Sequence, residues 1–422
     1  MANNLTSNTT RKVARVFLDA FESNRVVTKT VDTQLLTGRF NPSSGSTADF
    51  KRPHDYKSIR TSGGDMTGQT KSSIIAGKAT GTVQDFLTVP IEWGALEEAI
   101  QLDQLEEIIA PAAKRIVTDL EVSFASYMLQ NASLRYGTHG TAVDAWSDIA
   151  GAGALLDSLG VDKSMGGSYL MNPFTTTALA DAQNGLYADS NLVRTAWERS
   201  QISKNFGGLS ALTSNAMATF TSSTGADRAG TLTAAPDPTY VTAKDTMTQS
   251  IAVTALQANM VVKAGELITI AGVNRLNLDT KQPMLDATGA AVAWTGVVTA
   301  DVTLGASGEG TLVVAGPAIY EATGQYNTVT AAPANGAVVT IVSASATTYQ
   351  PNLFYVKQAF GIGTVKLPKL YATDTVATTS DGFSIRICKY SDGDSNKQMV
   401  RFDLLPAFAT FNPMMAGQGF GV

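Results

Sequence analysis

The sequence predicts an α+β protein that carries an inserted unit made mostly of β-strands. Three observations indicate this: a long amphipathic helical pattern over 102–133, alternating helix and strand signals over 146–200, and short β-type runs separated by turn residues over 222–346. A chain of 422 residues is also too long for one ordinary hydrophobic core. We therefore expect several compact units organised around one long helix.

The N-terminal region predicts a short amphipathic helix over Thr10–Glu22, with the polar cluster Ser7–Thr9 before it as a cap. An amphipathic helix usually buries its apolar face in its own domain, and the alternative is that it docks on a partner. The apolar face consists of Val13, Val16, Phe17, Ala20 and Phe21.

The stretch 39–90 is rich in Gly, Ser, Thr and Lys and has no helical periodicity. Only brief pieces such as Thr82–Val89 resemble strands. Segments this long without core signals are uncommon inside compact domains and are usually functional or disordered. The sequence therefore predicts an extended, hairpin-like loop.

The long helix is expected to run from Pro111 to Asn131, a length of roughly 30 Å at 1.5 Å per residue. Proline has no N–H to donate, so Pro111 suits the first turn, and Asn131 is a stop signal. One stripe of the helix is apolar and should face a core: Ala113, Ile116, Val117, Leu120, Phe124, Tyr127 and Met128.

Alternating signals follow the long helix. Asn172 and Pro173 form a cap and a first-turn proline for a helix that reaches Asn184. A strand is expected at Ser168–Met171 and a further helix at Ser190–Ser200. Another helix should present Trp146, Ile149, Leu155, Leu156 and Leu159 on one face.

The region 222–346 has few charges and predicts a small all-β unit inserted into the chain. Its Val-, Ile- and Thr-rich runs are Ser250–Leu256, Glu266–Val273, Ala291–Leu304 and Ala337–Ser343. Beyond it, two alternating runs, Phe383–Tyr390 and Gln398–Leu405, flank Ser391–Asp394 and predict a hairpin.

The composition favours self-association. Only 16% of the residues are charged while 44% are hydrophobic, which is typical of surfaces that other protein covers. The net charge of −5 disfavours specific nucleic-acid recognition, which needs many Lys and Arg contacts to phosphate. The chain has neither the apolar core of a signal peptide nor a run of about 18 apolar residues, so we expect no secretion by that route and no membrane span.

The residues that usually carry catalysis are scarce. His54 and His139 are the two histidines, and neither lies near a carboxylate pair or near the single cysteine, Cys388. Cys388 lies between apolar strand residues and is expected to be a small buried hydrophobe. The sequence therefore predicts neither an enzyme nor a bound cofactor.

Two motif fragments imitate ligand sites. Asp392, Asp394 and Asn396 have the opening spacing of a calcium loop, but Lys397 replaces the required glycine, and a plain hairpin turn is favoured. Residues 76–80 imitate the end of a phosphate-binding loop without its first glycine, and are expected to form a loop turn. No metal site is predicted.

Several stretches resemble coat proteins of short-tailed and related double-stranded DNA phages. The most specific is Lys263–Val273, followed by Asp279–Lys281. The others keep the family's order: Pro351–Phe354 leading to Pro368, then Gly382–Arg386, then Arg401–Leu405. The resemblance covers almost the whole chain.

This resemblance implies the Hong Kong ninety-seven phage capsid fold with an inserted β-barrel domain. It also makes Leu209–Phe220 and Leu353–Lys369 strands of one sheet. The implied parts are an N-terminal arm (1–33), an extended loop (34–90), a peripheral domain with a spine helix (91–145), an axial domain in two parts (146–221 and 349–380), the inserted β-barrel domain (222–348) and a C-terminal hairpin returning to the peripheral domain (381–422).

The resemblance further implies a major capsid protein whose pentamers and hexamers form an icosahedral head enclosing double-stranded DNA without sequence recognition. Because the chain starts with the arm and has no coiled-coil prodomain, a separate scaffolding protein is expected, with a portal protein at one vertex. Assembly would take place in the host bacterial cytoplasm. The alternative, prompted by the Thr-rich β insert, is a phage surface decoration protein or a receptor- or carbohydrate-binding protein.

Charge patterning suggests how copies would join. The extended loop is basic, and the segment leading into the long helix is acidic. We expect the loop of one copy to lie on the acidic segment of the next; the alternative is that both are merely solvated surfaces. The candidate interface residues are Lys51, Arg52, Lys57 and Arg60 on the loop, with Lys71 and Lys78 nearby, and Glu97, Glu98, Glu106 and Glu107 on the segment, with Glu92 and Asp103 nearby.

Overall fold

A computed structural model of the protein describes two compact units built from interleaved stretches of the chain. The first unit contains 1–48, 81–125 and 360–409, and the second contains 49–80, 126–359 and 410–422. The residues described are 6–36, 38, 40, 45–94, 105–161, 166–184, 205–322, 324–371, 374–392 and 397–422. The expected helix at 190–200 therefore lies outside the described residues.

The first unit holds an antiparallel sheet in the order β20-β21-β22-β3. Its register pairs Arg386 with Asp403 and Asp392 with Lys397, so the predicted C-terminal hairpin pairing is confirmed. The turn at 393–396, with its calcium-like spacing, lies outside the described residues. The strands are β20 (Thr375–Thr378), β21 (Ser384–Asp392), β22 (Lys397–Leu404) and β3 (Leu87–Gly94).

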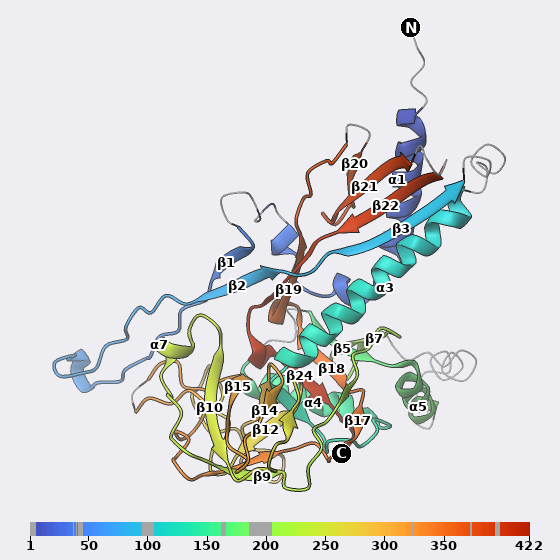
Figure 1. Ribbon diagram of the computed structural model, residues 1–422. Coiled ribbons are helices and arrows are strands. Elements are labelled where there is room, and N and C mark those ends of the chain that lie inside the picture. The colour runs from blue at the N-terminus through green and yellow to red at the C-terminus, as the bar shows by residue number, and fades with distance from the viewer. Residues whose placement is uncertain are drawn as a thin grey trace. The chain divides into compact units, whose positions relative to one another are not determined.

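The N-terminal helix α1 (Thr6–Asn24) packs on this sheet (Figure 1). It begins at Thr6, so Ser7–Thr9 lie inside the helix and do not precede it as a cap. Phe17 stacks on Phe402 with ring centroids 4.3 Å apart, and both side chains are fully buried. Burying a phenylalanine contributes roughly 2–3 kcal/mol, so this apolar face is bound within its own unit, as favoured from the sequence.

A second sheet has the order β1-β2-β23-β19. Within the expected loop over 34–90, the structure places β1 and β2, which are neighbours in this sheet, and the start of β3. The extended, hairpin-like loop as a separate part of the chain stays a prediction. β2 starts at Lys78, so the expected loop turn at 76–80 leads directly into a strand. Between β1 and β2 the chain makes only a short 3-10 turn at Ser62–Gly64. The strands are β1 (Thr47–Lys51), β2 (Lys78–Val83), β23 (Pro406–Thr410) and β19 (Phe360–Thr364).

The long helix α3 (Leu105–Asn131) is about 40 Å long at 1.5 Å per residue. It ends where the sequence predicts but starts six residues before Pro111, so the first-turn placement of this proline is wrong. The missing N–H leaves the carbonyl of the exposed Glu107 without its helical partner, a position that water can reach. The predicted apolar stripe is confirmed, because its members from Ala113 to Met128 are buried except Tyr127, which is half-buried.

The second unit contains a six-stranded sheet in the order β4-β24-β18-β5-β7-β6. Every residue of β18 and β5 is buried, which is typical of central strands covered on both faces. β18 and β7 share this sheet as predicted, whereas β19 belongs to the other sheet. The strands are β4 (Leu134–Tyr136), β24 (Ala416–Gly419), β18 (Asn352–Val356), β5 (Gly167–Met171), β7 (Leu209–Thr213) and β6 (Asn205–Phe206).

Two helices accompany this sheet, α4 (Trp146–Leu159) and α5 (Pro173–Asn184). The predicted cap of α5 is confirmed: the N–H of Thr175 donates to Oδ1 of Asn172 at 2.8 Å. Trp146 is 52% exposed and does not join the predicted apolar face, because it opens the helix ahead of the turns that the core covers.

The last strand, β24, belongs to the six-stranded sheet, and the expected return of 381–422 to the peripheral domain stays a prediction. β24 pairs with β18 and β4, and 410–422 belong to the second unit. A separate two-stranded ribbon of β8 (Phe220–Thr221) and β17 (Thr348–Tyr349) lies where the chain enters and leaves the inserted segment.

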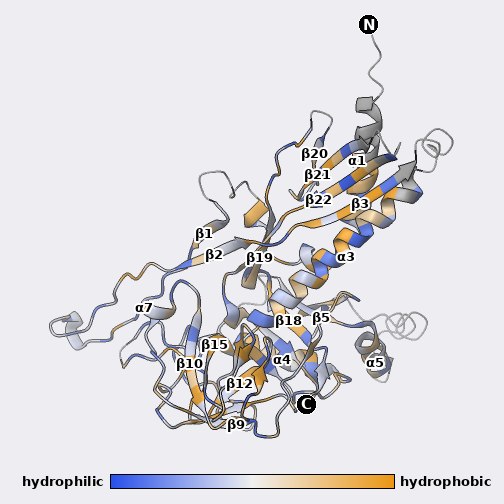
Figure 2. Ribbon diagram, viewed as in Figure 1, coloured by the Kyte–Doolittle hydropathy of each residue, from blue (hydrophilic) through white to orange (hydrophobic). Residues whose placement is uncertain are grey.

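The inserted segment forms a closed barrel in the order β10-β15-β13-β12-β16-β9. Its core contains Trp294, Ile251 and Leu312, all fully buried, and Figure 2 colours much of β10 and β12 as hydrophobic. A short ribbon of β11 (Val261–Val262) and β14 (Val302–Thr303) and the one-turn helix α7 (Tyr240–Ala243) flank the barrel. The barrel strands are β9 (Ala229–Leu232), β10 (Thr248–Thr254), β12 (Leu267–Ile270), β13 (Gly296–Val298), β15 (Gly310–Ala315) and β16 (Val338–Ile341).

Candidate functional site

Residues 52–77, the hairpin loop, present cations and apolar side chains to solvent. The two limbs are joined where the N–H of Arg52 donates to the carbonyl of Gly77 at 2.9 Å and where the N–H of Lys57 donates to Oγ of Ser72 at 2.9 Å. Within the described part of the chain, the exposed side chains of Lys57, Arg60 and Lys71 have no ion-pair partner. Ile74 adds an apolar group that is 76% exposed. The hairpin loop therefore exposes both charged and apolar groups that could bind another protein.

Arg52 does not belong to this exposed surface. Its side chain is buried, Nε donates to the carbonyl of Lys78 at 3.0 Å, and Nη1 donates to the carbonyl of Phe411. Burial lowers the pKa of Arg52 to about 10, so it stays charged at neutral pH. Arg52 therefore holds the base of the hairpin loop within its own subunit, and its expected role at a subunit interface needs correction. A basic residue in a Gly- and Ser-rich stretch gives no sequence signal of burial.

Lys78 is also engaged within its own chain. Its Nζ lies 2.9 Å from Oδ2 of Asp49, and Thr80 donates to the same carboxylate at 2.7 Å. These hydrogen bonds, with that from Thr80 the stronger influence, lower the pKa of Asp49. Among the described residues, the cations of this region without an ion-pair partner are therefore Lys51, Lys57, Arg60 and Lys71.

The acidic half of the expected interface is described only in part. Glu97 and Glu98 lie outside the described residues, as does the side chain of Glu106, while Glu107 is exposed on α3. Glu92 forms an ion pair with Lys397 across the neighbouring strands β3 and β22. Contact between the acidic segment of one copy and the hairpin loop of another stays a prediction.

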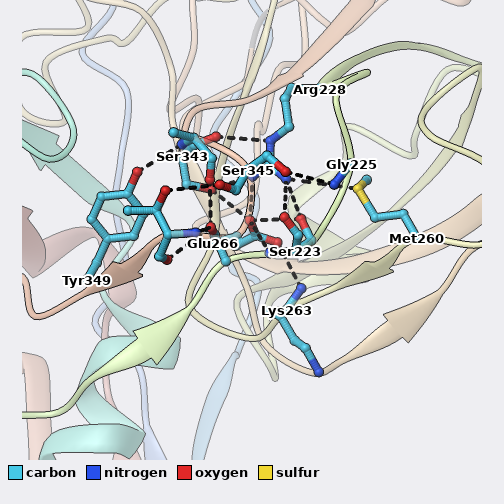
Figure 3. Close-up of polar contacts among 12 residues, drawn as sticks. Ser223, Gly225, Arg228, Met260, Lys263, Glu266, Ser343, Ser345 and Tyr349 are labelled. Atoms are coloured by element: carbon cyan, nitrogen blue, oxygen red, sulfur yellow. Dashed lines mark hydrogen bonds and ion pairs between the residues drawn. The ribbon is translucent and has the colours of Figure 1, made fainter.

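A buried carboxylate at the ends of the inserted segment is a feature that the sequence analysis missed. Glu266 is fully buried, and its Oε1 accepts hydrogen bonds from Arg228 Nη2 at 2.6 Å and from Ser343 Oγ at 2.7 Å (Figure 3). The N–H and Oγ of Ser223 donate to the same oxygen, and the N–H of Lys263 donates to Oε2 at 2.9 Å. A charged residue between the apolar runs of 261–270 is the signal that could have indicated a buried ion pair.

Arg228 is the second half of this network. Its Nε donates to the carbonyl of Ser343 at 3.0 Å and its Nη1 donates to the carbonyl of Ser223 at 2.9 Å. Ser223 belongs to the chain entering the barrel and Ser343 to the chain leaving it. With its donors and acceptors bonded to one another, the network fixes both chain ends and leaves the Glu266 carboxylate closed to a substrate.

His139, Cys388 and His54 lie in different environments. His139 packs edge-on to Tyr349 at 4.4 Å and against Phe420 at 4.3 Å, with both ring nitrogens buried and without a hydrogen-bond partner among the described residues. Burial, aided by Arg135, lowers the pKa of His139 to about 4. His54 is exposed. The structure therefore does not bring the two histidines to a common nucleophile.

Cys388 is buried as the sequence predicts, and its Sγ donates to Oδ2 of Asp374 at 3.3 Å. Burial and the Asp374 carboxylate raise the pKa of the Cys388 thiol to about 11. The thiol therefore stays protonated and unreactive at neutral pH.

Cavities, metal ligands and membrane-spanning helices are the other features that could indicate a function. A cavity of 420 Å³ in the first unit is lined by charges of both signs, and its Arg25 already pairs with Asp381. Within the described ranges no three His, Cys, Asp or Glu side chains converge as metal ligands. In the same ranges no helix combines the length and the apolar character needed to cross a membrane.

Comparison with known proteins covers the whole chain. The family model described as "P22 coat protein - gene protein 5" matches residues 1–421. A "Major capsid protein" of Acyrthosiphon pisum secondary endosymbiont phage 1 is 43% identical over 425 residues, and the match covers 100% of both chains.

The solved structures that match the chain include capsids of two phages, at TM-scores below 0.5. The capsid structure of Cyanophage P-SCSP1u matches with 11% identity and a TM-score of 0.45, covering 94% of this chain and 89% of that one. The capsid of Ralstonia phage GP4 matches with 7% identity and a TM-score of 0.45, covering 94% of this chain and 92% of that one.

Proposed function

The chain belongs to the P22 coat protein family and is a phage major capsid protein, and from this premise we propose that it assembles as pentamers and hexamers into an icosahedral head around double-stranded DNA. The observation that carries the proposal is the end-to-end match to the family and to a relative 43% identical. The low share of charged residues, 16%, supports a subunit that is largely covered by its neighbours.

We assign the chain the Hong Kong ninety-seven phage capsid fold. In this assignment α3 is the spine helix, the hairpin loop is the extended loop, and the closed barrel is the inserted domain. The boundaries proposed are 1–33, 34–90, 91–145, 146–221, 222–348, 349–380 and 381–422, with the last part shared between the two compact units. The mixed α+β content and the barrel support this assignment.

The proposed partners follow from the same role. A scaffolding protein would direct assembly in the host bacterial cytoplasm, and a portal protein would occupy one vertex. With a net charge of −5, the shell would enclose DNA without holding it through many phosphate contacts, which would otherwise hinder packaging and ejection. We assign the chain no enzymatic step.

Subunit contacts are proposed between the hairpin loop of one copy and the acidic segment before α3 of the next. The exposed Lys57, Arg60 and Lys71 support this, since they have no ion-pair partner among the described residues. An exposed ion pair contributes under about 1 kcal/mol, but a shell repeats each contact in every subunit. Arg52 is left out of this contact because it is bonded within its own chain.

The proposal is tested by electron microscopy of the chain co-expressed with the scaffolding protein of its phage. We expect closed shells of uniform size, and fewer or irregular particles when the chain is expressed alone. A decoration or receptor-binding protein would stay a small oligomer in both cases on size-exclusion chromatography. Only small oligomers in the presence of the scaffolding protein would overturn the proposal.

A further inference from the structure

Both limbs of the hairpin loop are bonded to the inserted barrel segment of the same chain. On the first limb, Oδ2 of Asp55 lies 2.7 Å from Nζ of Lys281. On the second limb, the carbonyl of Ser73 accepts a hydrogen bond from Nε2 of Gln325 at 2.7 Å. All four residues belong to the second unit, so this contact lies within one compact body. The barrel thus holds the loop from both sides.

The end of the hairpin loop, at Gly77 and Lys78, lies in close contact with residues 240–245. The N–H of Lys78 donates to Oδ1 of Asp245 at 3.2 Å. A Cβ at Gly77 would lie 2.7 Å from the carbonyl oxygen of Lys244 and 2.9 Å from the hydroxyl of Tyr240, closer than real Cβ atoms come. Glycine is therefore required here for the backbone to approach the chain around α7, which Figure 1 shows beside the loop.

The barrel side of this contact is built around a stacked aromatic pair. The rings of Tyr240 and Tyr326 stack with centroids 3.8 Å apart and planes 11° apart. The hydroxyl of Tyr326 also accepts the N–H of Asp55 at 3.5 Å. Residues distant in the sequence, around 240–245, 281 and 325–326, thus form one seat for the two limbs.

The seat at the barrel segment affects the rest of the hairpin loop, residues 56–71. Residues 56–71 are mostly exposed, and in the described structure their one bond to the opposite limb is that between Lys57 and Ser72. A loop held only at its ends would sample many directions, and ordering it on binding costs roughly 1–2 kcal/mol per residue fixed. Fixing both limbs at the barrel removes part of this cost before a second copy arrives.

We propose that the inserted barrel is an intramolecular brace that sets the direction of the hairpin loop in the unassembled subunit. The brace presents Lys57, Arg60 and Lys71 to a neighbouring copy in one orientation. This inference rests on the proposed function as a shell subunit, and it gives the inserted segment a role in every subunit contact that the loop makes.

The brace is tested by hydrogen exchange of the full-length, unassembled protein. Lys281→Glu places a carboxylate next to that of Asp55. Gly77→Ala adds a Cβ that would clash with Lys244 and Tyr240 and so displaces the second limb from the barrel segment. We expect peptides within 53–77 to exchange roughly two- to fivefold faster in Lys281→Glu, the range expected when a partly exposed ion pair is lost, and faster still in Gly77→Ala.

A matched control keeps the comparison specific. Lys263 forms an ion pair of the same length, 2.7 Å, with Asp301 elsewhere on the barrel segment, so Lys263→Glu breaks an equivalent pair away from the loop. It should leave exchange of the loop unchanged. The double variant Asp55→Lys with Lys281→Glu restores a pair of opposite polarity and should return exchange toward the wild type. Unchanged hydrogen exchange of peptides from the barrel strands shows that the barrel stays folded.

Co-expression with the scaffolding protein gives the second readout. We expect Lys281→Glu and Gly77→Ala to give shells of irregular size, and Lys263→Glu to give normal ones. Unchanged exchange of the loop, or faster exchange with shells as uniform as the wild type, would overturn the brace. Failure of the wild-type chain to form shells would instead contradict the proposed function, while the exchange experiment would still report on the brace.

Discussion

Arg228 Nη2 lies 2.6 Å from Oε1 of Glu266, and the Glu266 side chain at this ion pair has no exposed surface. The same carboxylate oxygen also receives hydrogen bonds from Ser223 and Ser343, which lie at the two ends of the inserted segment. One buried carboxylate therefore joins the chain that enters the barrel to the chain that leaves it. This arrangement makes the inserted segment a closed unit with neighbouring ends.

The excised segment 222–348 is expected to fold alone as a stable monomer, because it has a closed barrel, its own core and joined ends. Trp294 is its single tryptophan and is fully buried, so its fluorescence reports the barrel core directly. We expect a β-type circular dichroism spectrum and one cooperative melt that coincides with the loss of the buried Trp294 signal. A coil-like spectrum would show that the boundaries or the domain assignment are wrong.

Glu266→Gln in this fragment should lower the free energy of unfolding by about 3 kcal/mol, because the mostly buried Arg228 loses its counter-ion. Urea unfolding followed by Trp294 fluorescence measures the change. Glu309→Gln removes a charge from an exposed side chain and should change the free energy by less than about 0.5 kcal/mol. Equal effects of the two substitutions would contradict the assigned role of the buried pair.

The triple variant Lys57→Glu, Arg60→Glu and Lys71→Glu should stay folded but fail to form closed shells with the scaffolding protein. Adding Glu97→Lys, Glu98→Lys and Glu106→Lys should partly restore assembly, since the complementary charges are exchanged. Electron microscopy counts the shells, and circular dichroism checks the fold.

A control for overall charge substitutes the exposed Lys357, Lys366 and Lys369 by Glu, which changes the net charge by the same amount. Normal shells from the first triple variant would rule out the hairpin loop as a charged contact. Arg52 is not included, because Arg52→Glu would bury a carboxylate at the base of the loop and unfold it.

His139 should make the second unit less stable in mild acid. Burial lowers its pKa to about 4 in the folded chain, against about 6.5 when unfolded. Between these values the unfolded chain binds a proton that the folded chain does not, so stability is complete above pH 6.5 and falls as the pH drops toward 4.

His139→Phe should therefore reduce the difference between the urea midpoints at pH 7 and pH 5. The charges of Arg135, Arg228 and Glu266, which also act on the ring, are left in place by the substitution. The exposed His54 serves as the control, and His54→Phe should keep the wild-type pH dependence. An unchanged midpoint difference in His139→Phe would show that this ring does not titrate with folding.

Features set by neighbours in the sequence were predictable. The Asn172 cap and Pro173 define the start of α5, and the apolar stripe of α3 is visible as a period of three to four residues. Pro111 shows the limit of such local rules, because α3 begins six residues before the proline that local chemistry places at its start, and Ile109 in this added stretch is buried.

Features set by distant residues were not predictable. The burial of Arg52 depends on carbonyl groups of Lys78 and Phe411, and the seat of the hairpin loop depends on residues 240–245, 281 and 325–326. Sequence patterning treats an arginine in a polar stretch as solvated, so it placed Arg52 at the interface with Lys57 and Arg60. Pairing across such separations leaves no periodic trace in the chain.

Because the barrel is closed, it has no edge strand that could pair with a neighbouring subunit when copies are packed closely in a shell. Open sheets end in strands whose unpaired N–H and C=O groups can recruit a strand from another chain, and this tendency grows with local concentration. In the barrel, β9 pairs with both β10 and β16, so the ring of six strands has no terminal strand. The closed ring therefore offers a neighbouring copy in a head no barrel edge at which strands could pair or exchange.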